Sequence, residues 1–125
     1  MPFKSEDPTR QRDPQTLVEE AVLEYTLGEP ALALKKIHDA LQQDQEFFPA
    51  YHALSEIYFS LRDYPMALAS AIRAHKLHPD DIHVNTSLSR IYMEMGDKTQ
   101  AEHYGAQARM LGWRDELKQP PPENK

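Results

Sequence analysis

Six histidines carry the metal-binding potential of this sequence: His38, His52, His75, His78, His83 and His103. His75 and His78 lie one helical turn apart, and His78 and His83 flank Pro79. A transition-metal site needs three or four converging ligands and further groups that orient them. His75 and His78 instead fall at an expected helix C-terminus, where a partly charged imidazole complements the helix dipole. We therefore expect the protein to bind no metal.

Other reactive groups show no arrangement that would support catalysis. Ser55 and Ser89 fall at positions of close helix packing in the repeat described below, so neither is expected to act as a nucleophile. The glycines are dispersed and form no phosphate-binding loop. Glu19 and Glu20 are consecutive, which places their carboxylates on different faces of a helix. The absence of cysteine excludes disulfides, thiolate ligands and cysteine nucleophiles, and we expect neither an enzyme nor a cofactor.

The charge balance narrows the classes of partner. The 125 residues contain 14 Lys and Arg against 20 Asp and Glu, for a net charge of −6. Nucleic-acid binders and polybasic membrane-surface proteins need an excess of positive charge, so we expect neither role. No apolar run approaches the ~20 residues that span a bilayer, and residues 1–13 lack the apolar core of a signal peptide. The sequence predicts a soluble cytoplasmic protein.

Apolar residues recur at intervals of three and four, as on one face of an amphipathic helix. Strand signals are weak. Helices are therefore expected at 15–27, 30–43, 49–61, 64–77, 83–95 and 98–111, and the expected fold class is all-α. Pro30 and Pro65 fall in the first turn of a helix, where the missing N–H costs nothing. Asp63 and Asp97 are expected to cap helix N-termini or to lie in the first turn as acidic residues.

A period of 34 residues organises these helices into pairs. The clearest series are two sets of alanines, Ala33, Ala67 and Ala101, and Ala40, Ala74 and Ala108. Small side chains let the two helices of a hairpin cross closely. The period divides the chain into repeats 14–47, 48–81 and 82–115, between a disordered tail at 1–13 and a proline-rich tail at 116–125. One hairpin cannot bury its apolar face alone, so about three stacked units are the minimum for a stable core.

The repeat resembles the tetratricopeptide repeat (TPR) family over residues 14–115. The middle repeat matches the family motif best, through Tyr51, Leu54, Ser55, Tyr58, Ala67, Ala74 and Pro79. The third repeat has Trp113 in place of the closing proline, and the first has Glu20 and Glu24 where Leu and Tyr are usual. The resemblance implies a right-handed superhelical solenoid of three helix-turn-helix hairpins, with a concave groove lined by the first helices. It also implies a protein-interaction scaffold without catalysis or cofactor.

If the first helices line a groove, the residues not used in packing should face it. They are Val18, Val22, Tyr25, His52, Glu56, Phe59, Thr86, Arg90 and Met93. Tyr25, Phe59 and Met93 are equivalent by the 34-residue period and would form one stripe across the groove. On this interpretation Leu23 and its equivalents in the other two repeats are the residues that pack in the core.

The charges along the groove indicate the chemistry of its partner. Glu56 and Arg90 are equivalent positions on neighbouring helices, which permits an ion pair. One TPR subfamily clamps the C-terminal carboxylate of chaperones, and its clamp positions correspond here to Val18, Val22, Ala53, His83 and Ser87. None of these supplies the fixed positive charge that such a clamp needs. Since the formal charge is −5 in the first repeat, −1 in the second and 0 in the third, we expect an apolar segment with some basic residues facing the first repeat.

The C-terminal end of the array leaves two alternatives. Helical repeats usually finish with a polar capping helix, whereas here the last packing helix is followed only by Trp113 and a short tail reaching Leu117. Either these two residues fold back as a minimal cap, which we favour, or the face formed by Tyr104, Leu111 and Trp113 binds a second copy. Two functions follow from the groove and from this end of the array. The first is an adaptor that binds a peptide or helical segment of a partner in its groove. The alternative is a self-assembling module, such as a homodimer, joined through its C-terminal helix.

Overall fold

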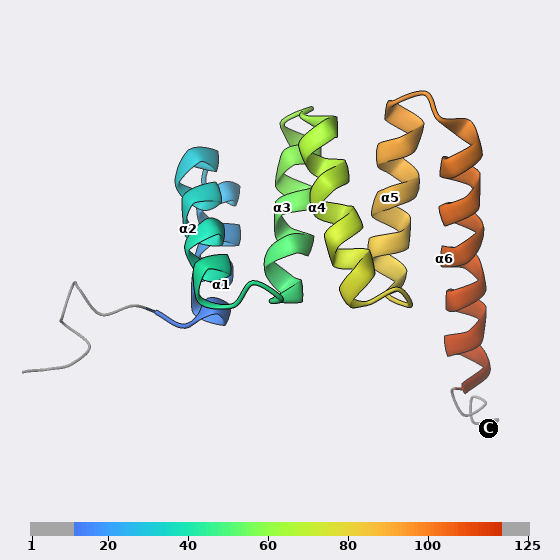
Figure 1. Cartoon of the computed structure of the whole chain (residues 1–125), viewed down its shortest axis with the longest axis horizontal. Helices are drawn as coiled ribbons and strands as arrows, with labels where there is room; N and C mark the ends of the chain where they lie inside the picture. The colour runs from blue at the N-terminus through green and yellow to red at the C-terminus, as the bar shows by residue number, and fades with distance from the viewer. Residues whose placement is uncertain (1–11, 119–125) are drawn as a thin grey trace, which may run out of the picture.

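The computed structural model describes residues 12–118, which form six helices joined by short loops (Figure 1). The helices are α1 (Pro14–Thr26), α2 (Pro30–Gln43), α3 (Phe48–Ser60), α4 (Tyr64–Leu77), α5 (Ile82–Glu94) and α6 (Lys98–Lys118). No strand occurs in this range, so the predicted all-α fold class is confirmed. Most of each predicted tail lies outside the described residues.

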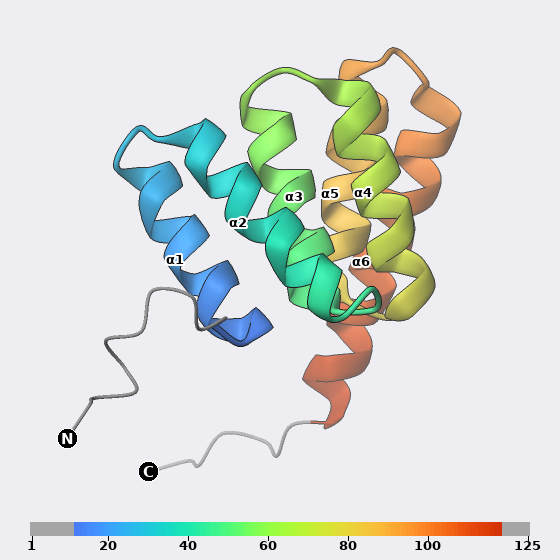
Figure 2. The ribbon, with the colours of Figure 1, turned by 60° about the vertical axis from the view of Figure 1, so that its left-hand side comes forward.

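Consecutive helices pack as three hairpins, α1 with α2, α3 with α4, and α5 with α6. The hairpins follow one another side by side in chain order (Figure 1, Figure 2). α2 packs against α3 and α4 against α5, while α1 contacts α3 and α3 contacts α5 directly. The first helices of the three hairpins are therefore neighbours, and α1, α3 and α5 are called the first-helix row below.

Small residues at repeated positions allow the helices to approach closely. Ala33 and its equivalents, 34 and 68 residues further on, are all buried. Ala40 and Ala74 are buried too. Ala108, their equivalent in α6, is only half-buried, because no further helix of the described chain follows to cover it. The burial pattern thus follows the number of neighbours that each hairpin has.

Aspartates cap the N-termini of four of the six helices. The carboxylates of Asp13, Asp63, Asp81 and Asp97 each accept a hydrogen bond from the backbone N–H three residues further on, at 2.7–3.3 Å. Such a cap satisfies an amide that the helix leaves unpaired and complements the positive end of the helix dipole. The caps predicted at Asp63 and Asp97 are confirmed, and so are the first-turn positions of Pro30 and Pro65.

The loop inside each hairpin turns through a residue with positive φ. Gly28 and Gly96 have φ values of 88° and 84°, and the equivalent residue of the middle hairpin is Arg62, at 64°. Arg62 is the one non-glycine residue with positive φ in the described range. This conformation costs an L residue roughly 1–2 kcal/mol, so the middle hairpin holds an arginine where glycine would be less strained.

The helix ends and the core differ from expectation in two places. α1, α3 and α5 begin and end one residue earlier than predicted, which is within the usual uncertainty of helix ends. The assignment of Leu23 to packing is wrong, since 59% of this residue is exposed while its equivalents Ile57 and Ile91 are buried. Ile57 and Ile91 lie on helices that follow another hairpin, whereas the described chain has no hairpin before α1 to cover Leu23.

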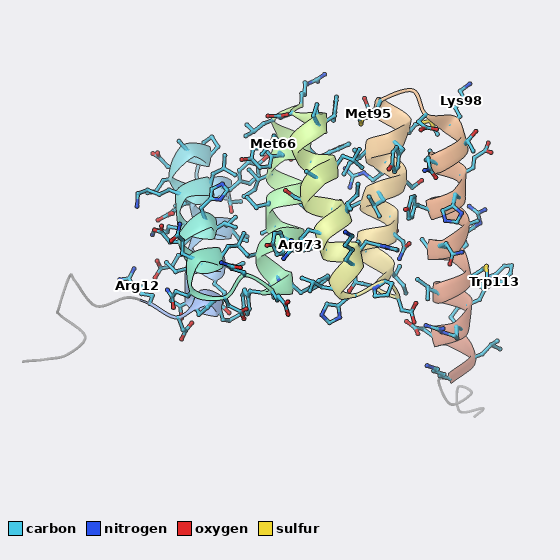
Figure 3. The ribbon with its side chains drawn as sticks, viewed as in Figure 1. Arg12, Met66, Arg73, Met95, Lys98 and Trp113 are labelled. Carbon is cyan, nitrogen blue, oxygen red and sulfur yellow. The ribbon has the colours of Figure 1, made fainter. Side chains whose placement is uncertain are left out.

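The predicted fold-back at the C-terminus is wrong. α6 continues as one helix through Gly112 to Lys118 instead of ending at residue 111. Trp113 lies on the side of α6 away from the other helices (Figure 3) and is 67% exposed, and Leu117 is exposed as well. Extending an existing helix adds a hydrogen bond with each residue and needs no new nucleus. The first residues of the segment predicted as a proline-rich tail are therefore helical.

Candidate interaction surface

The nine predicted groove residues lie on the first-helix row, and eight of them reach the surface. Val22, Thr86, Arg90 and Met93 are exposed, and Tyr25, His52, Glu56 and Phe59 are half-buried. The assignment of Val18 to the groove is wrong, because this residue is 6% exposed and packs in the core. Val18 and Ala21 are three residues apart and share a helix face, and that face is buried.

The stripe predicted from Tyr25, Phe59 and Met93 is anchored at two of its three positions. Two clusters of buried residues form the core, one that includes Ala21 and Leu54 and one that includes Ala71 and Leu88. Tyr25 packs partly against the first cluster and Phe59 partly against the second. Met93 is 52% exposed. A half-buried ring is held in place by the core while its remaining surface faces outward, and such rigid aromatic residues are common anchors of binding surfaces.

Arg90 of α5 contacts two residues of α3. Its guanidinium carbon lies 4.4 Å from the centroid of the Phe59 ring, in a cation–π contact. Its Nη1 atom lies 3.8 Å from Oε1 of Glu56, which confirms the predicted ion pair. Glu56 also accepts a hydrogen bond from the hydroxyl of Ser87. Both charged side chains are about half exposed, so the ion pair contributes only ~0.2–1 kcal/mol.

An open hollow of about 330 Å³ lies beside this contact. It is lined by Phe59, Ser60, Arg62, Tyr64, Arg90 and Glu94. The rings of Phe59 and Tyr64 are 5.5 Å apart, and the Tyr64 hydroxyl donates a hydrogen bond to Glu94 at 3.4 Å. The repeat pattern does not predict Arg62 and Tyr64 as lining residues, because it assigns the groove to the first helices alone. One signal was present, since an arginine stands where the other two repeats have glycine.

The histidines of the middle and third hairpins pack against aromatic rings. Phe48 stacks on His52 at 6.1 Å between ring centroids and meets the edge of His78 at 4.2 Å. The rings of His52 and His83 lie 6.4 Å apart. Within residues 12–118, no group of three or more histidine, aspartate or glutamate side chains is placed to hold a metal ion.

Tyr104, a predicted self-association residue, is partly buried and packs against the core. Its ring stacks on Tyr92 at 5.8 Å with an angle of 7° between the planes. His75 of α4 meets the same ring edge-on at 5.5 Å. Burial lowers the pKa of His75, and the nearby charge of His103 lowers it further. Burial also raises the pKa of Tyr92.

The outer side of α6 carries a row of exposed apolar residues. Met110, Trp113 and Leu117 are all exposed, and their spacing of three and four places them along one face of the helix. The assignment of Leu111 to the self-association surface is wrong, because this residue is buried. Of the three predicted self-association residues, Trp113 alone is well exposed, and Met110 is an exposed neighbour that the repeat pattern does not predict.

The two glutamates that distinguish the first repeat are ion-paired. Lys36 of α2 lies between Glu20, at 3.1 Å, and Glu24, and Arg12 contacts Glu20 at 2.8 Å. The hydrogen bond to Glu24 raises the pKa of Lys36. In the other two hairpins the equivalent positions hold leucine and tyrosine. Part of the negative charge of the first repeat is therefore neutralised within the hairpin, which weakens the expectation that this repeat attracts basic residues.

No protein-family model matches this chain, and no curated protein matches it. None of the helices between residues 12 and 118 is both long enough and apolar enough to cross a bilayer.

Proposed function

We propose that this protein is a three-repeat adaptor of the TPR type, which acts in the cytoplasm and binds a peptide or helical segment of a partner protein. The proposal includes the right-handed superhelical path and the concave groove that the sequence resemblance implies. The main support is the direct packing of α1 on α3 and of α3 on α5. This packing makes neighbours of the helices that carry Tyr25, Phe59 and Met93.

The composition of the first-helix row suits an amphipathic segment. Tyr25 and Phe59 offer half-buried aromatic surface, and Val22 and Met93 offer exposed aliphatic surface. Arg90 adds a charged group beside Phe59, with its guanidinium lying over the ring. A partner segment with apolar side chains at regular spacing would gain affinity from the rings and orientation from the charge.

Selection from a random dodecapeptide library displayed on phage tests the proposal. We expect the immobilised protein to enrich a family of related peptides. A synthetic member of that family should bind Phe59→Ala roughly tenfold or more weakly, because aromatic anchors commonly contribute ~2 kcal/mol or more. Met66→Ala removes an exposed apolar side chain of α4 and serves as the matched control with unchanged affinity. Failure to enrich any peptide, or equal losses in both variants, would refute the adaptor function.

Self-assembly through α6 is the second candidate function. It is supported by the exposed row of Met110, Trp113 and Leu117, since contiguous apolar surface often marks an interface. Light scattering over a range of concentrations should then show a mass above that of the 14.4 kDa monomer. Trp113→Ala should lower that mass, and Phe59→Ala should not. A monomer mass that stays constant with concentration rules this candidate out.

A further inference from the structure

Two arginines of the hollow beside Phe59 hold donors that the described protein does not use. The side chain of Arg62 forms no ion pair with any described residue. Arg90 approaches Glu56 at 3.8 Å, the longest ion-pair distance in residues 12–118. Neither guanidinium donates a hydrogen bond to another described side chain. Because each guanidinium carries several N–H donors in a fixed plane, these groups are free to bind an acceptor from outside the domain.

The backbone conformation of Arg62 is a second indication that its side chain takes part in binding. The equivalent loops of the other hairpins turn in the same conformation through Gly28 and Gly96. The turn itself therefore needs only glycine, and Arg62 adds strain to the middle hairpin. Strained residues of this kind are concentrated at binding sites, and Arg62 lines the hollow.

The charges of the hollow select its ligand. The lining contains two arginines and one glutamate, an excess of one positive charge that a single carboxylate would neutralise. A phosphoryl group carries roughly −1.5 to −2 at neutral pH and would be repelled more strongly by Glu94 and by the adjacent Glu56. The rings of Phe59 and Tyr64, 5.5 Å apart, offer apolar contact to the methylene groups of a side chain.

We propose that this hollow binds the carboxylate of an aspartate or glutamate side chain on the partner segment. The inference rests on the proposed adaptor function and specifies one residue that the partner must carry. Arg62 and Arg90 pair with the carboxylate, because the planar guanidinium matches its two oxygens and charge-assisted hydrogen bonds are strong. The acidic residue is thereby held where α5 meets the end of α3.

The same dodecapeptide library tests the inference through Arg62→Gly. This variant removes the charge but keeps a residue that the sister hairpins use at the same turn, so it should fold at least as well as the wild type. Peptides selected on the wild type should share an aspartate or glutamate, and those selected on Arg62→Gly should not. Arg73→Gln removes an arginine of α4 that lies over the ring of Tyr51, outside the hollow, and is the matched control with unchanged selection.

A double-mutant cycle then assigns the contact. Replacing the shared acidic residue of the peptide by its amide should weaken binding to the wild type roughly tenfold or more. The same replacement should weaken binding to Arg62→Gly much less, because only Arg90 then remains to pair with the carboxylate. A phosphoserine peptide that binds the wild type more tightly than the acidic peptide would overturn the choice of carboxylate.

The two proposals fail in different ways. If peptides are selected and lose affinity with Phe59→Ala, but share no acidic residue, the adaptor function stands and the carboxylate site is wrong. If the wild type selects no peptide, the adaptor function fails and the inference fails with it.

Discussion

The guanidinium of Arg90 lies 4.4 Å from the ring centroid of Phe59 and joins α5 to α3 across the first-helix row. Arg90 and Glu56 occupy equivalent positions of successive repeats, and they meet because successive first helices pack directly on each other. The same arginine also lines the hollow beside Phe59. One side chain therefore contributes to the contact between two hairpins and to the surface that we propose for partner binding.

The Arg90–Phe59 contact should have a measurable coupling energy. Phe59→Leu and Arg90→Gln each remove one partner, and the double variant removes both. Cation–π contacts at exposed sites contribute ~0.5–1 kcal/mol, so the double variant should be less destabilised than the sum of the single variants by about that amount. Urea denaturation of the wild type and the three variants measures the four free energies of unfolding. Strictly additive effects would mean that the observed contact contributes nothing.

Asn85 fixes the turn between α4 and α5 and was missed from the sequence. It is fully buried, and its side-chain amide donates to the backbone oxygens of Pro79 at 3.0 Å and Asp81 at 2.9 Å. Asn85→Ala leaves the Pro79 carbonyl without this donor, whereas the Asp81 carbonyl keeps the backbone N–H of residue 85. The free energy of unfolding should therefore fall by about 1–3 kcal/mol. The neighbouring exposed Thr86→Ala should change it by less than about 0.5 kcal/mol. A similar small effect in both variants would contradict the role of Asn85.

The alanine positions of the repeat should not accept larger side chains. Ala67 is fully buried, whereas Ala69 of the same helix is exposed. Ala67→Leu should destabilise the protein by about 1–3 kcal/mol, because the added methylene groups force the helices apart. Ala69→Leu should be nearly neutral, since leucine is also a good helix former. Thermal melts of the two variants compare the positions directly, and equal melting temperatures would count against close packing at Ala67.

The pH dependence of stability should carry a contribution from His75. Burial lowers the pKa of His75 below its ordinary value of about 6.5, the charge of His103 lowers it further, and Asp80 has a smaller opposite effect. The unfolded chain therefore binds a proton at His75 more readily than the folded protein does. The free energy of unfolding should fall as the pH drops below about 6.5, until the folded state is protonated as well.

The variant His75→Gln isolates this contribution, because it removes this imidazole and leaves the rest of the chain unchanged. Urea denaturation of both proteins between about pH 8 and pH 5 should give a shallower decline for the variant. Identical slopes would show that His75 titrates alike in the folded and unfolded states.

The interior of the array was more predictable than its ends. A 34-residue pattern assumes that every repeat has a neighbour on both sides, and this holds for the middle hairpin, where Ile57 is buried as predicted. The assumption fails at α1, where Leu23 is exposed and Glu20 pairs with Lys36, and at α6, where Trp113 is exposed. The 34-residue pattern also predicts which residues share a helix face. It does not predict which loop residue lies beside that face.

The candidate surface is likewise predictable from the sequence only in part. Phe59 and Arg90 were predicted because both lie on first helices at repeated positions, and their contact follows from helix packing. Arg62 and Tyr64 line the same hollow from the end of the loop and the start of α4. Their positions depend on how two hairpins meet in space, which no local pattern in the sequence encodes.

The strain at Arg62 leads to a prediction about stability that does not depend on any ligand. Arg62→Gly relieves a left-handed conformation that costs roughly 1–2 kcal/mol, and adds flexibility to the unfolded chain that offsets about 0.5–1 kcal/mol of the gain. The variant should therefore be more stable by about 0.5–1 kcal/mol. The converse change, Gly96→Ala, imposes the same strain on the third hairpin at φ 84° and should destabilise it by a comparable amount.

Urea denaturation of both variants beside the wild type measures the two effects. If Arg62→Gly were less stable than the wild type, the arginine side chain would have to make stabilising contacts within the domain. It would then not be free to bind a partner, and the carboxylate site would lose its main support. A more stable variant that no longer selects acidic peptides would show that the middle hairpin gives up stability at this turn in return for a binding group.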